Sequence, residues 1–234
     1  GDLIHTKSKI CDWENIDDQI KKLETKILNQ DKASAPFTAT TLFDSPNLIF
    51  KVAKIWESGF KSKKDFTQKY INKDKKKIKI GYYSADFRTH AMGHLLVRMF
   101  ELHDKSSFEL HGFYFGPPVD QKDLLQKRII RCFDSFNDIS KLNDKSVCDL
   151  SKKLEIDIAI DLMGYTGNRN RFGIFLTKLA PIQINFLGYP GTSGSKFLDY
   201  IVADKILITK ENEKYYSEKI IYLPDTYQAN EDIK

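Results

Sequence analysis

An aspartate and a histidine four residues apart, Asp86 and His90, have the types and spacing of an acid/base pair. An imidazole has the pKa needed to accept a proton from a hydroxyl group, and a neighbouring carboxylate can fix its tautomer or raise its basicity. The alternative interpretation is that Asp86 caps a turn and His90 is an ordinary surface residue. The spacing alone leaves both interpretations open.

The residues around this pair predict the elements that hold it. An apolar run at 78–83 is typical of a buried strand, and apolar residues at helical spacing predict a helix over 93–103. A strand, a loop and a helix make the first unit of an open α/β sheet, in which ligands bind at the carboxyl ends of the strands. The loop between them, 84–92, is therefore the first place to look for a function.

The rest of the chain continues this alternation of strands and helices. Further strands are predicted at 108–114, near Cys132 and Phe133, and at 156–162, 182–187, 199–203 and 220–223. Helices are predicted between them at about 123–131, 144–154, 171–179 and 210–216. Such alternation predicts an α/β fold with a mostly parallel sheet over residues 78–234.

Two amphipathic helices precede the α/β region, at 11–30 and from Ser45-Pro46 to Gly59, with a loop at 31–44 between them. They form a small helical segment, 1–60, whose apolar faces need a partner to dock on. A linker at 61–77 follows, with eight Lys and two Asp and hence a net charge of +6. It contains no Arg and few aromatic residues, which favours a solvated linker over a nucleic-acid site. We expect no nucleic-acid partner.

Two other loops leave the carboxyl ends of predicted strands. Loop 188–194, GYPGTSG, has the flexibility to bring backbone N–H groups near a phosphate or sugar, but a tight turn explains it equally well. Loop 163–170 offers the hydroxyl groups of Tyr165 and Thr166. His94 lies one turn beyond His90, but no third ligand is visible, so we expect no metal and no bound cofactor.

The bulk composition limits the class of protein. Three cysteines without CxxC spacing argue against a disulfide framework and favour a reduced, cytoplasmic protein. No apolar run approaches the ~20 residues of a membrane span, so we expect no membrane partner.

Several motifs, taken in order, resemble the catalytic region of the O-linked N-acetylglucosamine transferases, including the SPINDLY-like members. They are DFRTHAMGHL at 86–95, GYT at 164–166, LGYPGTSG at 187–194, DYI at 199–201 and YSEKI at 216–220. The CDW at 11–13 and PF at 36–37 also resemble the segment that links that family's tetratricopeptide repeats to its catalytic region.

The resemblance implies a GT-B glycosyltransferase, in which donor and acceptor meet between two Rossmann-like lobes. Residues 78–234 then form the N-terminal lobe, with the second lobe and the repeats absent, so that this fragment alone is inactive. It implies transfer of a sugar, N-acetylglucosamine first among candidates, from a nucleotide-diphosphate donor such as a UDP-sugar to Ser or Thr of a protein or peptide.

The resemblance also implies roles for individual positions. The family's functional Asp and His fall on Asp86 and His90. The backbone at Ala91 and Met92 approaches the sugar, and the residues Leu187, Gly188, Tyr189 and Pro190 line the sugar or acceptor side. Two alternatives remain open: a non-catalytic scaffold for protein interactions, and another Rossmann-type nucleotide-sugar enzyme.

Overall fold

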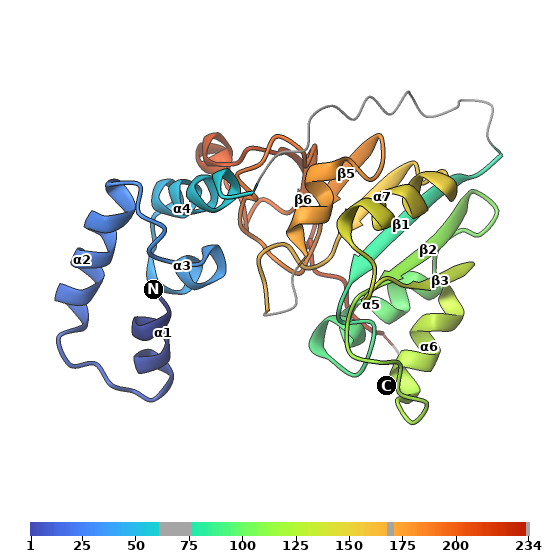
Figure 1. Ribbon diagram of the computed structural model, residues 1–234, viewed down its shortest axis with the longest axis horizontal. Coiled ribbons are helices and arrows are strands. Elements are labelled where there is room, and N and C mark those ends of the chain that lie inside the picture. The colour runs from blue at the N-terminus through green and yellow to red at the C-terminus, as the bar shows by residue number, and fades with distance from the viewer. Residues whose placement is uncertain (61–75, 168–170, 233–234) are drawn as a thin grey trace.

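The computed structural model describes residues 1–60, 76–167 and 171–232. A group of helices lies at one end of the molecule and an α/β lobe at the other (Figure 1). The predicted Lys-rich linker, 61–77, falls outside the described residues except at its last two positions. Among the residues described, no helix is long and apolar enough to cross a membrane.

The lobe is built on one parallel sheet of seven strands, in the order β3-β2-β1-β4-β5-β6-β7. Their bounds are β1 Ile78–Ser84, β2 Phe108–Tyr114, β3 Ser135–Asp138, β4 Ile158–Asp161, β5 Ile182–Asn185, β6 Tyr200–Ala203 and β7 Lys219–Tyr222. The predicted α/β class with a mostly parallel sheet is confirmed. The strand order reverses between β1 and β4, and such a switch point opens a ligand crevice at the carboxyl edge of the sheet.

Helices α5, Ala91–Glu101, α6, Leu124–Cys132, and α7, Asp144–Lys153, connect the strands. The short strand predicted near Cys132 and Phe133 is present slightly later, as β3 at Ser135–Asp138, because Cys132 ends α6 and Phe133 packs into the core beneath that helix. The predicted helices at 171–179 and 210–216 are short 3₁₀ helices, η1 at Phe172–Thr177 and η2 at Lys210–Tyr215.

Two apolar clusters cover the two faces of the sheet. Adjacent strand residues point to opposite faces, so Tyr82 belongs to the cluster beneath α5 and α6 while Tyr83 belongs to the cluster beneath α7. Phe87, directly after β1, is also fully buried and packs edge-on against Phe100 of α5. The loop that carries Asp86 and His90 is thereby anchored to the core at its centre.

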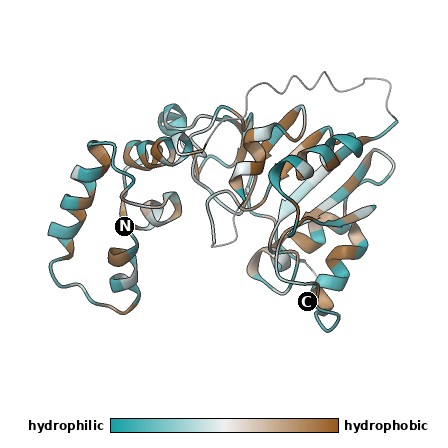
Figure 2. Ribbon diagram, viewed as in Figure 1, coloured by the Kyte–Doolittle hydropathy of each residue, from teal (hydrophilic) through white to brown (hydrophobic). Residues whose placement is uncertain are grey.

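The N-terminal segment contains four helices rather than the two predicted: α1 Asp2–Lys9, α2 Ile16–Leu28, α3 Pro36–Leu42 and α4 Pro46–Ser58. Cys11 and Asn15 have positive φ angles and end the helical pattern before α2. The predicted loop at 31–44 contains α3, which begins at a proline. Figure 2 shows hydrophobic and hydrophilic residues on different faces of α2 and α4, which pack around their own small core.

Aromatic residues of this helical segment dock it on the lobe. Trp56 of α4 donates from Nε1 to the Ser34 carbonyl at 2.6 Å, and its ring meets Tyr165 edge-on with centroids 6.3 Å apart. The ring centroids of Phe60 and Phe172 lie 5.7 Å apart. The apolar faces of these helices therefore pack partly against one another and partly, through Trp56, against the lobe beside the loop after β4.

We predict that Trp56→Ala lowers the free energy of unfolding by about 2–3 kcal/mol, because it removes both the ring contact and the indole hydrogen bond. Trp13→Ala is the matched control, since Trp13 is 57% exposed, and its cost is within about 0.5 kcal/mol. Urea unfolding followed by circular dichroism measures both. Equal losses in the two variants would contradict the docking role.

Candidate active site

Three loops meet at the carboxyl edge of the neighbouring strands β1, β4 and β5. The Ser84 hydroxyl at the end of β1 lies 3.6 Å from the Met163 sulfur in the loop after β4. A Cβ added to Gly188, after β5, would lie 1.9 Å from the Leu162 carbonyl oxygen. The loop after β4 thus contacts both of the other loops. The loop that carries Asp86 and His90 therefore lies at the same edge of the sheet as the glycine-rich turn.

His90 is the N-cap of helix α5. Its Nδ1 accepts a hydrogen bond from the Met92 backbone N–H at 3.2 Å, and its ring is 39% exposed. Since the lone pair of Nδ1 is engaged, the neutral ring carries its proton on Nε2, which is then a hydrogen-bond donor. For Nε2 to act as a base, Nδ1 has to exchange the Met92 N–H for a proton shared with Asp86.

The Asp86 carboxylate lies close to the His90 nitrogen that would carry this shared proton. Its Oδ2 is 3.6 Å from Nδ1 of His90, too long for a hydrogen bond in this arrangement. Its Oδ1 accepts from the Arg88 guanidinium at 3.2 Å, and its side chain is largely buried. His90, not Asp86, is therefore the helix cap, and Asp86 belongs to an ion pair at the cleft rim. The acid/base role of the pair stays a prediction.

Ala91 and Met92 form the first turn of α5. Ala91 is exposed and Met92 is half-buried. A helix N-terminus carries a partial positive charge and favours anionic groups nearby. The backbone predicted to approach the sugar thus lies at the positive end of an eleven-residue helix whose other end is far from the cleft.

The glycine-rich turn after β5 is held by its own hydrogen bonds. The N–H groups of Gly188, Ser193, Gly194 and Ser195 all donate within the turn or to Glu218. Leu187 adopts a positive φ of 64° at its start. These four N–H groups are not offered to a ligand, which favours the tight-turn interpretation over a phosphate cradle.

The two tyrosines predicted near the sugar are core residues. Tyr165 and Tyr189 are 5% and 1% exposed and meet edge-on at 5.6 Å. The Tyr165 hydroxyl donates to the Ser193 carbonyl at 2.8 Å, and Thr166 donates to its own turn. Their side chains support the loops from below.

Of the predicted sugar-side residues after β5, Leu187 and Tyr189 are buried, whereas Gly188 and Pro190 are half-buried and reach the surface. A cavity of about 370 Å³ opens beside Pro190, between the turn, η2 and the start of α4. Any contact between this turn and a ligand is therefore made by backbone and by Pro190.

Buried polar residues that the sequence analysis passed over hold these loops. Glu218, 5% exposed, accepts hydrogen bonds from the Thr192 hydroxyl and the Ser193 N–H, both at 2.7 Å, and from the Ser193 hydroxyl. Burial raises the pKa of the Glu218 carboxyl. Asp161 and Asn185 end β4 and β5 and are 1% exposed. In the sequence, the signal that could have identified these residues is a polar residue at the end of an otherwise apolar strand.

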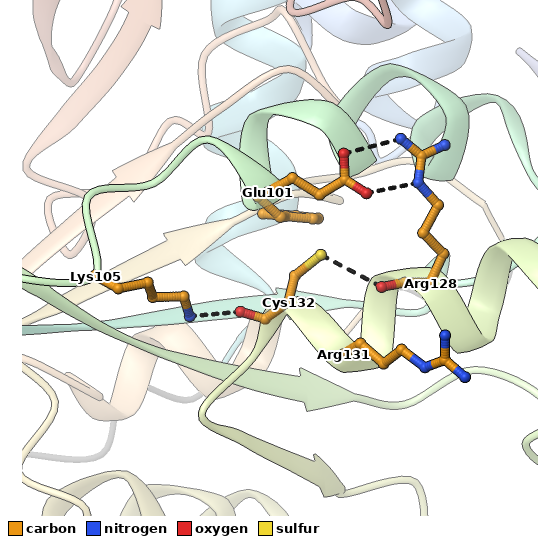
Figure 3. A pocket seen from close by; sticks show the side chains of 6 residues that line it. Glu101, Lys105, Arg128, Arg131 and Cys132 are labelled. Carbon is orange, nitrogen blue, oxygen red and sulfur yellow. Dashed lines mark hydrogen bonds and ion pairs between the residues drawn. The ribbon is translucent and has the colours of Figure 1, made fainter. Parts of the chain in front are cut away.

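A second cavity, of about 390 Å³, lies between the ends of α5 and α6 (Figure 3). Two of the three cations that line it are paired: Arg128 contacts Glu101 at 2.7 Å and Glu231 at 2.5 Å, and Lys105 contacts Asp134 at 3.0 Å. The pair between Arg128 and Glu231 ties the C-terminal tail to α6. Helices in a parallel sheet run opposite to the strands, so this cavity lies at the edge away from His90. Within the described ranges, no three His, Cys, Asp or Glu side chains are grouped as metal ligands.

The parallel sheet, its switch point and the loops at its carboxyl edge define a Rossmann-like lobe. The model of glycosyl transferase family 41 matches residues 48–233, and the chain belongs to this family. The resemblance found in the sequence is thereby confirmed.

Similar proteins include a probable UDP-N-acetylglucosamine–peptide N-acetylglucosaminyltransferase, SEC, of Arabidopsis thaliana, 29% identical over 98% of this chain and 25% of its own length. The Caenorhabditis elegans UDP-N-acetylglucosamine–peptide N-acetylglucosaminyltransferase is 28% identical over 93% of this chain and 20% of its own length. A mutant O-GlcNAc transferase of Thermobaculum terrenum shares the fold, with a TM-score of 0.74 at 23% identity over 93% of this chain and 44% of that one. The chain thus spans a quarter or less of the length of the Arabidopsis thaliana and Caenorhabditis elegans proteins.

We predict that Glu218→Ala lowers the free energy of unfolding by about 3 kcal/mol, because a backbone N–H and two hydroxyl groups lose their acceptor in a buried place. Glu211→Ala, at an exposed position of η2, is the control and costs within about 0.5 kcal/mol. Chemical denaturation measures both. A loss at Glu218 as small as the control's would mean that the turn does not depend on this carboxylate.

Proposed function

We propose that this chain is the N-terminal lobe of an inverting protein O-glycosyltransferase. The enzyme moves a sugar, N-acetylglucosamine first among candidates, from a UDP-sugar to a Ser or Thr hydroxyl of a protein or peptide. The observation that carries the proposal is the half-exposed His90 ring at the N-terminus of α5, beside Asp86 and at the switch point of the sheet. Membership of glycosyl transferase family 41 and the names of the similar proteins support it.

His90 has two possible contributions, which depend on its tautomer. With Nδ1 bonded to the Met92 N–H, Nε2–H donates to an oxygen of the donor sugar or diphosphate. With Nδ1 protonated toward Asp86, Nε2 accepts the proton of the attacking hydroxyl as its oxygen bonds to the sugar and the diphosphate departs. Asp86 selects between the two states and is a positioning residue.

The remaining parts of the enzyme belong to segments that the family resemblance implies. A second lobe closes the cleft and meets the charge of the departing diphosphate, so that the reaction uses no metal. Tetratricopeptide repeats before the helical segment bind the acceptor protein. A cytoplasmic location agrees with the free cysteines, one exposed and two buried. This lobe alone then has no transferase activity.

We predict that His90→Ala in the full-length protein lowers the rate of sugar transfer by about 10²–10⁴-fold, the range for loss of a general acid or base. His94→Ala is the matched control, because His94 is exposed on the same helix one turn away, and it keeps the wild-type rate. Transfer from UDP-N-acetylglucosamine to acceptor peptides, followed by mass spectrometry, measures both. If His90→Ala transfers sugar at the wild-type rate, the catalytic role of His90 is wrong. If the full-length wild-type protein transfers no sugar, the scaffold alternative is favoured.

We further predict that this chain alone binds UDP-N-acetylglucosamine no more tightly than about 1 mM. The N–H groups of Gly188, Ser193 and Gly194 in the glycine-rich turn are bonded internally or to Glu218, which leaves fewer donors to hold a diphosphate. Isothermal titration calorimetry measures the affinity. A micromolar Kd would contradict this expectation and favour the Rossmann-type nucleotide-sugar enzyme.

A further inference from the structure

Two buried oxygen atoms without hydrogen-bond partners lie at matching positions of neighbouring strands. Asp161 ends β4 and Asn185 ends β5, and the two residues are register partners in the parallel ladder. The Asp161 Oδ2 and the Asn185 Oδ1 are both fully buried and unpaired. Register partners in adjacent parallel strands are about 4.8 Å apart and point to the same face of the sheet. The two orphan oxygens therefore belong to neighbouring side chains.

The orientation of the Asn185 amide is fixed by the loop above it. Its Nδ2 donates to the carbonyl oxygens of Tyr189 at 3.0 Å and Gly191 at 3.3 Å. Turning the amide over would place its oxygen against these two carbonyl oxygens, which is unfavourable. The amide therefore keeps Nδ2 on the loop and Oδ1 on the other side, and Nδ2 cannot serve as a donor to Asp161. Asn185 presents an acceptor, and only a donor can satisfy it.

The Asp161 side chain is held in the same way from its own loop. Its Oδ1 accepts from the backbone N–H groups of Met163 and Gly164, each at 2.9 Å. An ionised carboxylate has no donor on Oδ2, whereas a protonated carboxyl group has one. Burial raises the pKa of Asp161 to about 6, and the two backbone hydrogen bonds only partly oppose this.

Among the described residues, the titratable groups near Asp161 and near the tyrosines beside it include no cation. They are Tyr83 on β1, Tyr165 and Tyr189 in the loops, Glu57 of α4 near Tyr165, Glu218 beyond the glycine-rich turn, and Cys148 of α7 near Tyr83. Burial raises the pKa of each of the three tyrosines, which stay neutral, and no cation contributes to the pKa of Asp161. Among the described residues, only the two backbone N–H groups favour its ionised form.

We propose that Asp161, in its protonated form, donates from Oδ2 to Asn185 Oδ1, and that this hydrogen bond positions two loops of the candidate active site. The Asp161 side chain holds the turn at Met163–Gly164, and the Asn185 side chain holds the turn at Tyr189–Gly191. Their mutual bond joins both turns into one floor. Ionisation of Asp161 would set two acceptors against each other and push the turns apart.

The stability of this chain against pH tests the bond without any assay of activity. A carboxyl group whose pKa is raised on folding contributes stability below its unfolded pKa of about 4, and this contribution is lost as pH rises through the folded pKa. Asp161→Asn keeps an acceptor for both N–H groups and adds an N–H donor for Asn185. We expect its melting temperature to match the wild type near pH 4 and to exceed it by several degrees at pH 8.

Asp138→Asn is the matched control, because Asp138 also ends a strand and accepts a loop N–H, from Ser140 at 2.9 Å, but is exposed. It should show no gain that grows with pH. Asp161→Ala should melt below the wild type at every pH, because the Met163 and Gly164 N–H groups lose their acceptor. An Asp161→Asn variant that melts below the wild type at pH 8 would overturn the proposal.

NMR titration of chain labelled with ¹³C-aspartate reads the proton directly. The Asp161 carboxyl carbon should titrate at about pH 6 or above, and Asn185→Ala should lower this midpoint because it removes the facing acceptor. A midpoint at the ordinary value of about 4 rejects the protonated acid.

The positioning role rests on the proposed function and is tested separately in the full-length protein. There, Asp161→Asn should keep transfer while Asp161→Ala loses it. If the titration succeeds but the full-length protein transfers no sugar, the hydrogen bond stands and the proposed function fails. If wild-type protein transfers sugar and Asp161→Ala does so equally well, the positioning role fails.

Discussion

Buried polar side chains at the ends of strands hold the candidate active site together. Glu218 alone accepts from a backbone N–H and two hydroxyl groups of the glycine-rich turn, and Asn185 donates to two of its carbonyl oxygens. A polar group buried without a partner costs about 1–3 kcal/mol, so each of these residues restricts its loop to the conformation that satisfies it. The loops at the carboxyl edge owe their shape to these bonds, since they contain little regular secondary structure.

The second constraint is the position of His90 as a helix cap. The same nitrogen that accepts the Met92 N–H faces the Asp86 carboxylate at 3.6 Å, so the cap and the acid/base pair compete for one lone pair. This competition couples the tautomer of the ring to the start of α5.

The helical segment is part of the same assembly. Its Trp56 rests on Tyr165, which in turn bonds to the Ser193 carbonyl in the glycine-rich turn. A Cβ on Gly194 would lie 2.7 Å from the Ala53 backbone, so helix and turn are in close contact. The contact passes from α4 through the loop after β4 to the loop after β5. The helical segment thus supports the loops after β4 and β5 directly.

The sequence by itself determined the α/β class, the order of strands and helices and the place of Asp86 and His90 after the first strand, because hydrophobic periodicity and local turn residues encode these features. The sequence analysis did not predict α1 and α3, because these helices are too short to show a clear pattern and are stabilised by packing around Ile4 and Ala39. Only the tertiary structure decided that Tyr165 and Tyr189 are buried, that His90 caps α5, and that Asp161 adjoins Asn185. These facts depend on which strands become neighbours, and strand neighbours such as β1 and β4 are brought together from positions about eighty residues apart, beyond the reach of any local pattern.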